Sequence, residues 1–208
     1  LCMGGNGPSA VTEEYDGSAW SSGGNLGTAR LGLAGCGTQT AGLCMGGWIS
    51  AVSAITEEYN GTSWSAGGSL ATAIYELAGA GTQSAGLCMG GTPGPINTTE
   101  EYDGTSWSAG GNLATARGAL AGCGTQSAGL CMGGDNPTNT ASNVTEEYNG
   151  TAWSAGGNLA TARYQIAGAG TQSAGLCMGG YAPVSNVTEE YGAGPGSYDE
   201  LFSPSQGL

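Results

Sequence analysis

The chain of 208 residues has no lysine, no histidine and a single phenylalanine, and its only cationic side chains are three arginines. Against 16 acidic residues this gives a formal net charge of -13. Such a charge repels phosphate backbones, so we expect no nucleic-acid binding. No basic cluster is present that could bind a lipid surface. No stretch approaches the roughly 20 apolar residues of a membrane span, so we expect no membrane insertion.

What the chain has in abundance is glycine, 43 residues of it, and an internal repeat. The phrase Leu-Cys-Met-Gly-Gly recurs with a period of about 44 residues, beginning at Leu1, Leu43, Leu87, Leu130 and Leu176. A period of this length indicates a stacked or radial architecture in which each unit depends on its neighbours. The units lie near residues 1–30, 31–74, 75–117, 118–163 and 164–191, and a tail or strand completion follows at 192–208.

The residues of one unit predict four short strands. Two runs of small residues, 33–37 and 42–47, form a hairpin that suits the crowded centre of a radial fold. A third strand contains Thr56-Glu57-Glu58-Tyr59, and a fourth begins near Trp64. Asn60-Gly61 between them predicts a type I′ turn, because both central residues of that turn need positive φ. Such four-stranded antiparallel sheets, repeated around an axis, form an all-β propeller, with a parallel β-helix as the alternative.

The number of blades depends on how the ends are used. If the inner strand at 166–170 completes the first unit, four blades close. If the tail around 198–202 supplies a last strand, five blades result. We favour about five blades, of which the first and the last are incomplete.

Each unit has a Gly-Gly pair after the second strand, then a tyrosine, and most have a tryptophan and an arginine that opens the next unit. This order resembles that of kelch repeats, which implies a β-propeller and little about function. Ile74 replaces one arginine, and the fifth unit departs after Tyr191. The Gly-Thr-Gln-Ser/Thr-Ala-Gly turns are also similar to repeat blocks in appendage and tail-fibre proteins of marine bacteriophages. The structural residues of the pattern are Arg30, Arg117, Arg163, Trp20, Trp64, Trp107 and Trp153.

The repeated acidic pairs are the first candidates for chemistry. Calcium prefers many oxygen ligands, but neighbouring strand residues such as Glu57 and Glu58 point to opposite faces, so a pair cannot chelate one ion. We expect one glutamate of each pair to be solvated and the other structural. Each arginine is predicted to form a partly buried ion pair with a repeat glutamate between neighbouring sheets.

Catalysis is not expected. Nucleophilic catalysis lacks a base without histidine or lysine, and a zinc site lacks its usual ligands. Paired carboxylates could hydrolyse a glycoside, and the segment 103–107 resembles the Asp-box of sialidase-like propellers without its Asp-x-Gly spacing. Yet every prominent acidic residue recurs around the ring, whereas an active site normally breaks symmetry. We therefore predict no catalytic residues, no metal and no cofactor.

The seven cysteines have two interpretations. Those between Leu and Met read as small buried apolar residues. Cys36 and Cys123 lie eight residues before Cys44 and Cys131, so a disulfide across each hairpin is the alternative, subject to demanding geometry.

Symmetry breaks in the segments between the Gly-Gly pairs and the Thr-Glu-Glu runs, which differ in length and content. All of them join a second to a third strand, so they emerge on one face of the ring, where binding usually resides. The candidate binding residues are Trp48, Tyr181, Asn6, Asp135 and Asn136. The alternative is that these segments are surface loops without a binding role, in which sequence variation is tolerated.

These observations favour a non-enzymatic structural or adhesive module, displayed on a virus particle or an extracellular appendage. Its partner would be a protein of a larger assembly or a surface glycan. The alternative is a secreted carbohydrate-binding lectin, and a sialidase-like glycoside hydrolase is the third hypothesis.

Overall fold

The computed structural model describes residues 1–4, 7–182 and 184–192, and over these residues it contains eighteen strands and no helix. The strands form five antiparallel sheets, which we call blades 1 to 5 in chain order. Because no described residue belongs to a helix, none forms an apolar helix that could cross a membrane. The strands are β1 (Cys2–Met3), β2 (Thr12–Tyr15) and β3 (Trp20–Ser22) in blade 1; β4 (Ala34–Thr38), β5 (Ala41–Met45), β6 (Thr56–Tyr59) and β7 (Trp64–Ala66) in blade 2; β8 (Ala78–Thr82), β9 (Ala85–Met89), β10 (Thr99–Tyr102) and β11 (Trp107–Ala109) in blade 3; β12 (Ala121–Thr125), β13 (Ala128–Met132), β14 (Thr145–Tyr148) and β15 (Trp153–Ala155) in blade 4; and β16 (Ala167–Thr171), β17 (Ala174–Met178) and β18 (Thr188–Gly192) in blade 5.

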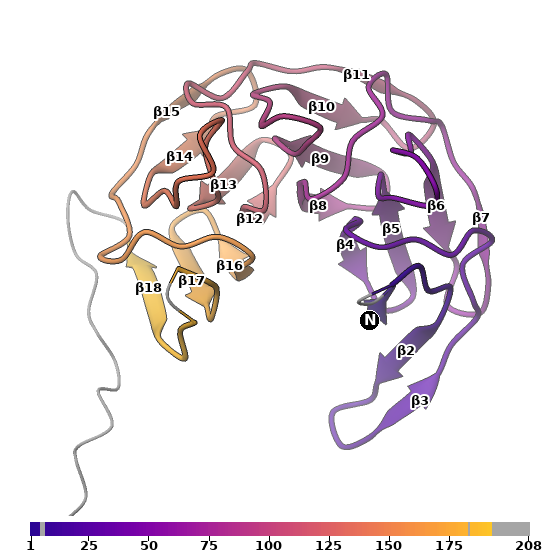
Figure 1. The fold of residues 1–208 in the computed structure, drawn as a ribbon. Helices are drawn as coiled ribbons and strands as arrows, with labels where there is room; N and C mark the ends of the chain where they lie inside the picture. The colour runs from indigo at the N-terminus through magenta and orange to yellow at the C-terminus, as the bar shows by residue number, and fades with distance from the viewer. Residues whose placement is uncertain (5–6, 183, 193–208) are drawn as a thin grey trace, which may run out of the picture.

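The blades stand side by side around a common centre, with β4, β8, β12 and β16 innermost (Figure 1). This confirms the predicted β-propeller with five blades, the first and last of three strands. The described part of the propeller is an open arc, since blade 1 and blade 5 are separated by an opening (Figure 1). Strand β16 pairs with β17, so the alternative in which it completes the first unit is wrong. The candidate strand at 198–202 lies outside the described residues.

Small residues form the inner strands because neighbouring blades touch there. A Cβ at Gly122 of β12 would lie 3.0 Å from the carbonyl oxygen of Gly79 in β8, and one at Gly168 of β16 would lie 3.0 Å from the oxygen of Gly122. Backbones at this distance leave no room for a larger side chain. The glycine-rich hairpins therefore set how closely the blades approach at the centre.

The third and fourth strands of blades 1 to 4 form hairpins as predicted, but the predicted type I′ turn is wrong. Tyr59 pairs with Trp64, so the loop has four residues. Only Gly61 has positive φ, at 88°. The side-chain oxygen of Asn60 accepts hydrogen bonds from the amides of Thr62 and Ser63, at 3.0 and 2.9 Å. An Asx turn of this kind needs one left-handed residue after the Asn or Asp, and glycine supplies it.

The cross-hairpin disulfides are also wrong, because all seven cysteines are free. The register places Cys36 opposite Leu43, and Gly35 opposite Cys44, so the two thiols are one position out of step and point to opposite faces of the sheet. The same offset separates Cys123 from Cys131. Burial raises the pKa of Cys36 and Cys44 to about 12, as expected for thiols held as small apolar groups.

Candidate functional site

Each arginine lies in the linker before a blade and reaches into that blade. The Nη1 group of Arg117 donates to the carbonyl oxygens of Gly133 and Val144, at 2.6 and 2.7 Å. Its Nη2 group donates to Cys131 Sγ at 3.2 Å and to Glu146 at 2.8 Å. Both side chains of this ion pair are buried, the arginine completely. This buried arginine–glutamate ion pair, which we call the clamp, is therefore a structural contact and is not partly exposed. The equivalent pairs are Arg30–Glu57 at 2.8 Å and Arg163–Glu189 at 2.5 Å.

Blade 3 dispenses with this clamp. Ile74 stands at the arginine position and is 1% exposed. Its glutamate, Glu100, is still buried, and it accepts hydrogen bonds from the amides of Ala71 and Thr72 at 2.8 and 3.1 Å. The Ala71 bond has an equivalent in the blades that keep the arginine, so it is the Thr72 amide that takes the place of the guanidinium at Oε1.

In blades 1 to 4 the second glutamate of the pair is not simply solvated, as the sequence had led us to expect, because it joins two blades. Glu58 of blade 2 accepts a hydrogen bond at 2.5 Å from the hydroxyl of Tyr102 in blade 3. Beside it, the indole Nε1 of Trp107 donates to Thr56 Oγ1 of blade 2 at 2.9 Å. In blades 1 to 4 the tyrosine ring lies against the tryptophan ring in a tilted arrangement, with ring centres 4.9 Å apart in blade 3. We did not predict this role from the sequence. The signal for it was that the glutamate, tyrosine, tryptophan and threonine recur together in the repeat. The corresponding tyrosine-to-glutamate bonds are Tyr59 to Glu14, Tyr148 to Glu101 and Tyr191 to Glu147.

The tyrosine-to-glutamate bond recurs between every pair of neighbouring blades, and the tryptophan-to-threonine bond between all but blades 4 and 5, so these contacts build the scaffold. The face that carries the variable loops is different. There the linker before each inner strand pairs with the loop between the second and third strands. The linkers are also joined to one another, because the amide of Glu76 donates to Gly32 O at 2.7 Å and that of Ala119 donates to Glu76 O at 2.8 Å. Glu76 and Ala119 both have left-handed φ angles, 53° and 49°, which non-glycine residues seldom adopt.

An aromatic pair lies on this loop face between blades 2 and 3. The rings of Trp48 and Tyr75 are 5.4 Å apart in an edge-to-face arrangement. Both side chains are partly buried and partly accessible. Trp48 is a predicted site residue, whereas Tyr75 was missed because it belongs to a linker rather than to a loop. The sequence signal for Tyr75 was the change of residue type at this linker position, which holds Leu31 in blade 2 and Gly118 in blade 4.

Two carboxylates lie close to this pair. Burial raises the pKa of Glu76 above its ordinary value, and the charge of Asp135 raises it further, while a hydrogen bond with the Thr92 side chain acts in the opposite direction. Asp135 Oδ1 is buried and accepts no hydrogen bond from the described residues. Gly118 makes the close approach possible, because a Cβ there would lie 2.7 Å from Thr92 Cγ2 and 3.1 Å from Asp135 Oδ1.

We call Trp48, Tyr75, Glu76, Thr92 and Asp135 the loop-face cluster. The other predicted binding residues lie apart from it. Tyr181 is 51% exposed and packs against Tyr164 of its own blade, with ring centres 5.5 Å apart. Asn136 shapes its own loop, since its Oδ1 accepts from the amides of Thr138 and Thr140. Asn6 lies outside the described residues.

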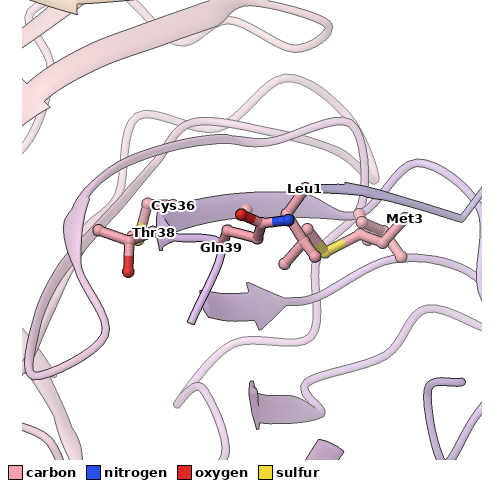
Figure 2. A pocket seen from close by; sticks show the side chains of 8 residues that line it. Leu1, Met3, Cys36, Thr38 and Gln39 are labelled. Carbon is pink, nitrogen blue, oxygen red and sulfur yellow. The ribbon is translucent and has the colours of Figure 1, made fainter. Parts of the chain in front are cut away.

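A cavity of about 420 Å³ lies near the centre of the arc, between β1 and β4. Figure 2 shows Leu1, Gln39 and Met3 beside one another along its wall. The cavity exists because blade 1 has only three strands. A Cβ at Gly79 would meet the backbone of β4 in the preceding blade, whereas the atoms of blade 1 that one at Gly35 would meet belong to the side chain of Met3, the nearest at 3.2 Å. The polar side chains that line it are those of Cys36, Thr38 and Gln39.

No group of three or more metal-binding side chains occurs in the described part of the chain. Comparison of the sequence with protein-family models and with curated proteins gives no match.

Proposed function

We propose that this chain is a non-enzymatic adhesive module that binds a glycan through the loop-face cluster. One observation carries the proposal: an aromatic pair and two carboxylates gather on one face of a scaffold that is otherwise repetitive. The positions of Trp48 and Tyr75 hold Thr92 and Gly118 at the next blade contact, and the tyrosines at these positions in blade 5, Tyr181 and Tyr164, pair within one blade rather than between two. A binding site for one ligand needs this kind of local asymmetry.

The chemistry of the cluster fits a sugar. The apolar face of a pyranose packs well against an aromatic ring, and an edge-to-face pair presents a ring face beside a polar rim. Carboxylates accept hydrogen bonds from hydroxyl groups. Glu76 is partly exposed and can accept such a bond, whereas the buried Oδ1 of Asp135 has no donor among the described residues, so its desolvation is not offset in the free protein.

The setting we propose is a structural part of a virus particle or an extracellular appendage. Support comes from the resemblance of the repeats to kelch propellers and to blocks in marine phage fibres, and from the acidic composition, which suits a soluble exterior surface. A lectin that acts alone is the second candidate, favoured by the same cluster. Stoichiometric recovery of the chain from purified particles would support the structural role over the independent lectin.

The test is a glycan array followed by calorimetric titration of the best ligand. Trp48→Ala and Glu76→Gln should each weaken binding at least about tenfold, equivalent to about 1.4 kcal/mol. Val184→Ala is the control, since Val184 is 78% exposed in the loop of blade 5, and it should bind as the parent does. A protein ligand whose binding ignores both cluster variants, or glycoside turnover by the purified chain, would contradict the proposal.

A further inference from the structure

The two ends of the arc carry the two halves of an interface that the chain already forms between its blades. We call the side of a blade that faces the following blade its acceptor face, and the opposite side its donor face. In blade 2 the acceptor face presents Thr56 and Glu58, which accept from Trp107 and Tyr102 of blade 3. A leucine completes each contact: Leu87 of blade 3 fills the space over Gly129 of blade 4, where a Cβ would lie 2.6 Å from its Cδ2.

Blade 1 exposes its donor face. Tyr15 is 45% and Trp20 57% exposed, whereas Tyr102 in an internal blade is completely buried. Neither the Tyr15 hydroxyl nor the Trp20 indole donates a hydrogen bond within the described residues. Their rings nevertheless lie tilted against each other with centres 5.1 Å apart, close to the 4.9 Å of the internal pair Tyr102–Trp107. The donor face is thus already arranged for a partner.

Blade 5 exposes its acceptor face. Glu190 is exposed, and its carboxylate has no hydrogen bond over the part of the chain that the structure describes. Leu176 and Met178 are partly exposed, whereas the equivalent Leu130 and Met132 of blade 4 are 0% and 1% exposed. A groove of about 440 Å³ crosses this face, lined by small and apolar residues together with Leu176 and Glu190.

We propose that the acceptor face of blade 5 binds the donor face of blade 1 in a second copy of this chain, head to tail. The Tyr15 hydroxyl of one copy would donate to Glu190 of the other, and the Trp20 indole to Thr188. The aromatic pair would pack against Leu176, as Tyr148 and Trp153 share one cluster with Leu87 of the preceding blade. The occupant is specified by the molecule itself, because the blade-to-blade interfaces inside the chain use these residue types at these positions.

The two faces differ, so the contact is heterologous and each copy keeps one free end for the next. Neither face has a cationic side chain, while each copy has a formal net charge of -13. Copies therefore repel one another at low ionic strength, and salt should strengthen their association by screening that repulsion. An interface made of ion pairs would respond in the opposite direction. Linear arrays would also present many loop-face clusters together, which would raise the avidity for a glycan. This gain in avidity is the only part of the inference that rests on the proposed function.

Sedimentation velocity over a range of concentrations and salt tests the proposal. The parent chain should form species larger than a dimer as either is raised. Two variants each block one end: Trp20→Ala with Tyr15→Ala on the donor face, and Leu176→Asp on the acceptor face. Each alone should remain a monomer, and an equal mixture of the two should form a dimer and nothing larger, because one intact pair of faces remains.

The milder variant Glu190→Ala removes the acceptor without adding a charge at an apolar site, and it should weaken association at least about tenfold. Tyr181→Ala, on the loop face of blade 5, should associate as the parent does. A parent chain that is monomeric at every concentration and salt overturns the proposal. So does continued growth of a blocked variant, failure of the mixture to form a dimer, or a monomer in which Trp20 becomes protected from a fluorescence quencher, which would indicate closure of the arc on itself.

Discussion

The hydroxyl of Tyr102 in blade 3 donates a 2.5 Å hydrogen bond to Glu58 of blade 2. The same hydroxyl accepts a hydrogen bond from the amide of Gly68 at 3.2 Å. One phenol thus joins a strand to both the neighbouring blade and the linker between them. Because the bond reaches a carboxylate, it is worth more than a hydrogen bond between neutral groups.

Tyr102→Phe should therefore destabilise the chain by about 1.5–3 kcal/mol, the usual value for a hydrogen bond to a charged group. The measurement is the free energy of unfolding in urea. Tyr15→Phe is a matched control, since the Tyr15 hydroxyl has no donor contact among the described residues, and its unfolding free energy should stay within about 0.5 kcal/mol of the parent. Equal effects of the two substitutions would show that the bond between blades contributes nothing.

Arg117→Met should be more damaging. It removes the cation from a pair that is completely buried and leaves Glu146 charged in an apolar setting, which typically costs about 3–5 kcal/mol. Adding Glu146→Gln should recover part of this loss, and the double-mutant cycle measures the coupling. If Arg117→Met unfolds at the same urea concentration as the parent, the clamp has no role in stability.

Ile74→Arg is the reverse substitution. It places a cation at the one blade position where an uncharged side chain stands in place of the arginine. A buried charge without a partner would unfold the blade. Here, however, the carbonyl oxygens of Gly90 and Thr98 and the carboxylate of Glu100 occupy the positions that bind arginine in blades 2, 4 and 5. We expect a folded variant at least as stable as the parent. Loss of cooperative unfolding would show that blade 3 has repacked around its isoleucine.

The raised pKa of Glu76 predicts a stability difference that depends on pH. A carboxyl that holds its proton more tightly when folded stabilises the protein below its unfolded pKa of about 4.5, and this contribution is lost as pH rises through the folded value. Glu76→Gln should therefore stabilise the chain at about pH 7 and lose that advantage at about pH 4.

Asp135→Asn provides the control for this effect, because the charge of Asp135 raises the pKa of Glu76. In the Asp135→Asn background the gain from Glu76→Gln should be smaller. An unchanged gain would mean that burial alone, without the second carboxylate, sets the pKa.

Thiol labelling reports the burial of the cysteines. Cys2 is exposed, whereas Cys88 is buried and burial raises its pKa well above the ordinary value. Since the thiolate is the reactive form, a native chain should react rapidly at one thiol, and Cys2→Ser should abolish that phase. Rapid reaction of several thiols would indicate that the blades separate in solution.

The local patterns of the sequence were sufficient to predict the blades. The repeat period located every sheet, and small residues such as Gly79 and Gly122 marked the inner strands because only they allow backbones to touch. The hairpin after Tyr59 was predicted, but its turn type was not, since the side chain of Asn60 rather than its own φ determines the loop. The one-residue offset between Cys36 and Cys44 likewise depends on strand register, which composition does not encode.

Hairpin signals and alternation act over a few residues, so they were enough to predict a ring-like array of small sheets with variable loops on one face. They could not predict which distant residues meet: Tyr102 with Glu58, Tyr75 with Trp48, and Glu76 with Asp135. The reason is that these contacts depend on the angle and spacing between neighbouring blades. That geometry arises from the packing of whole sheets, and no short stretch of residues specifies it.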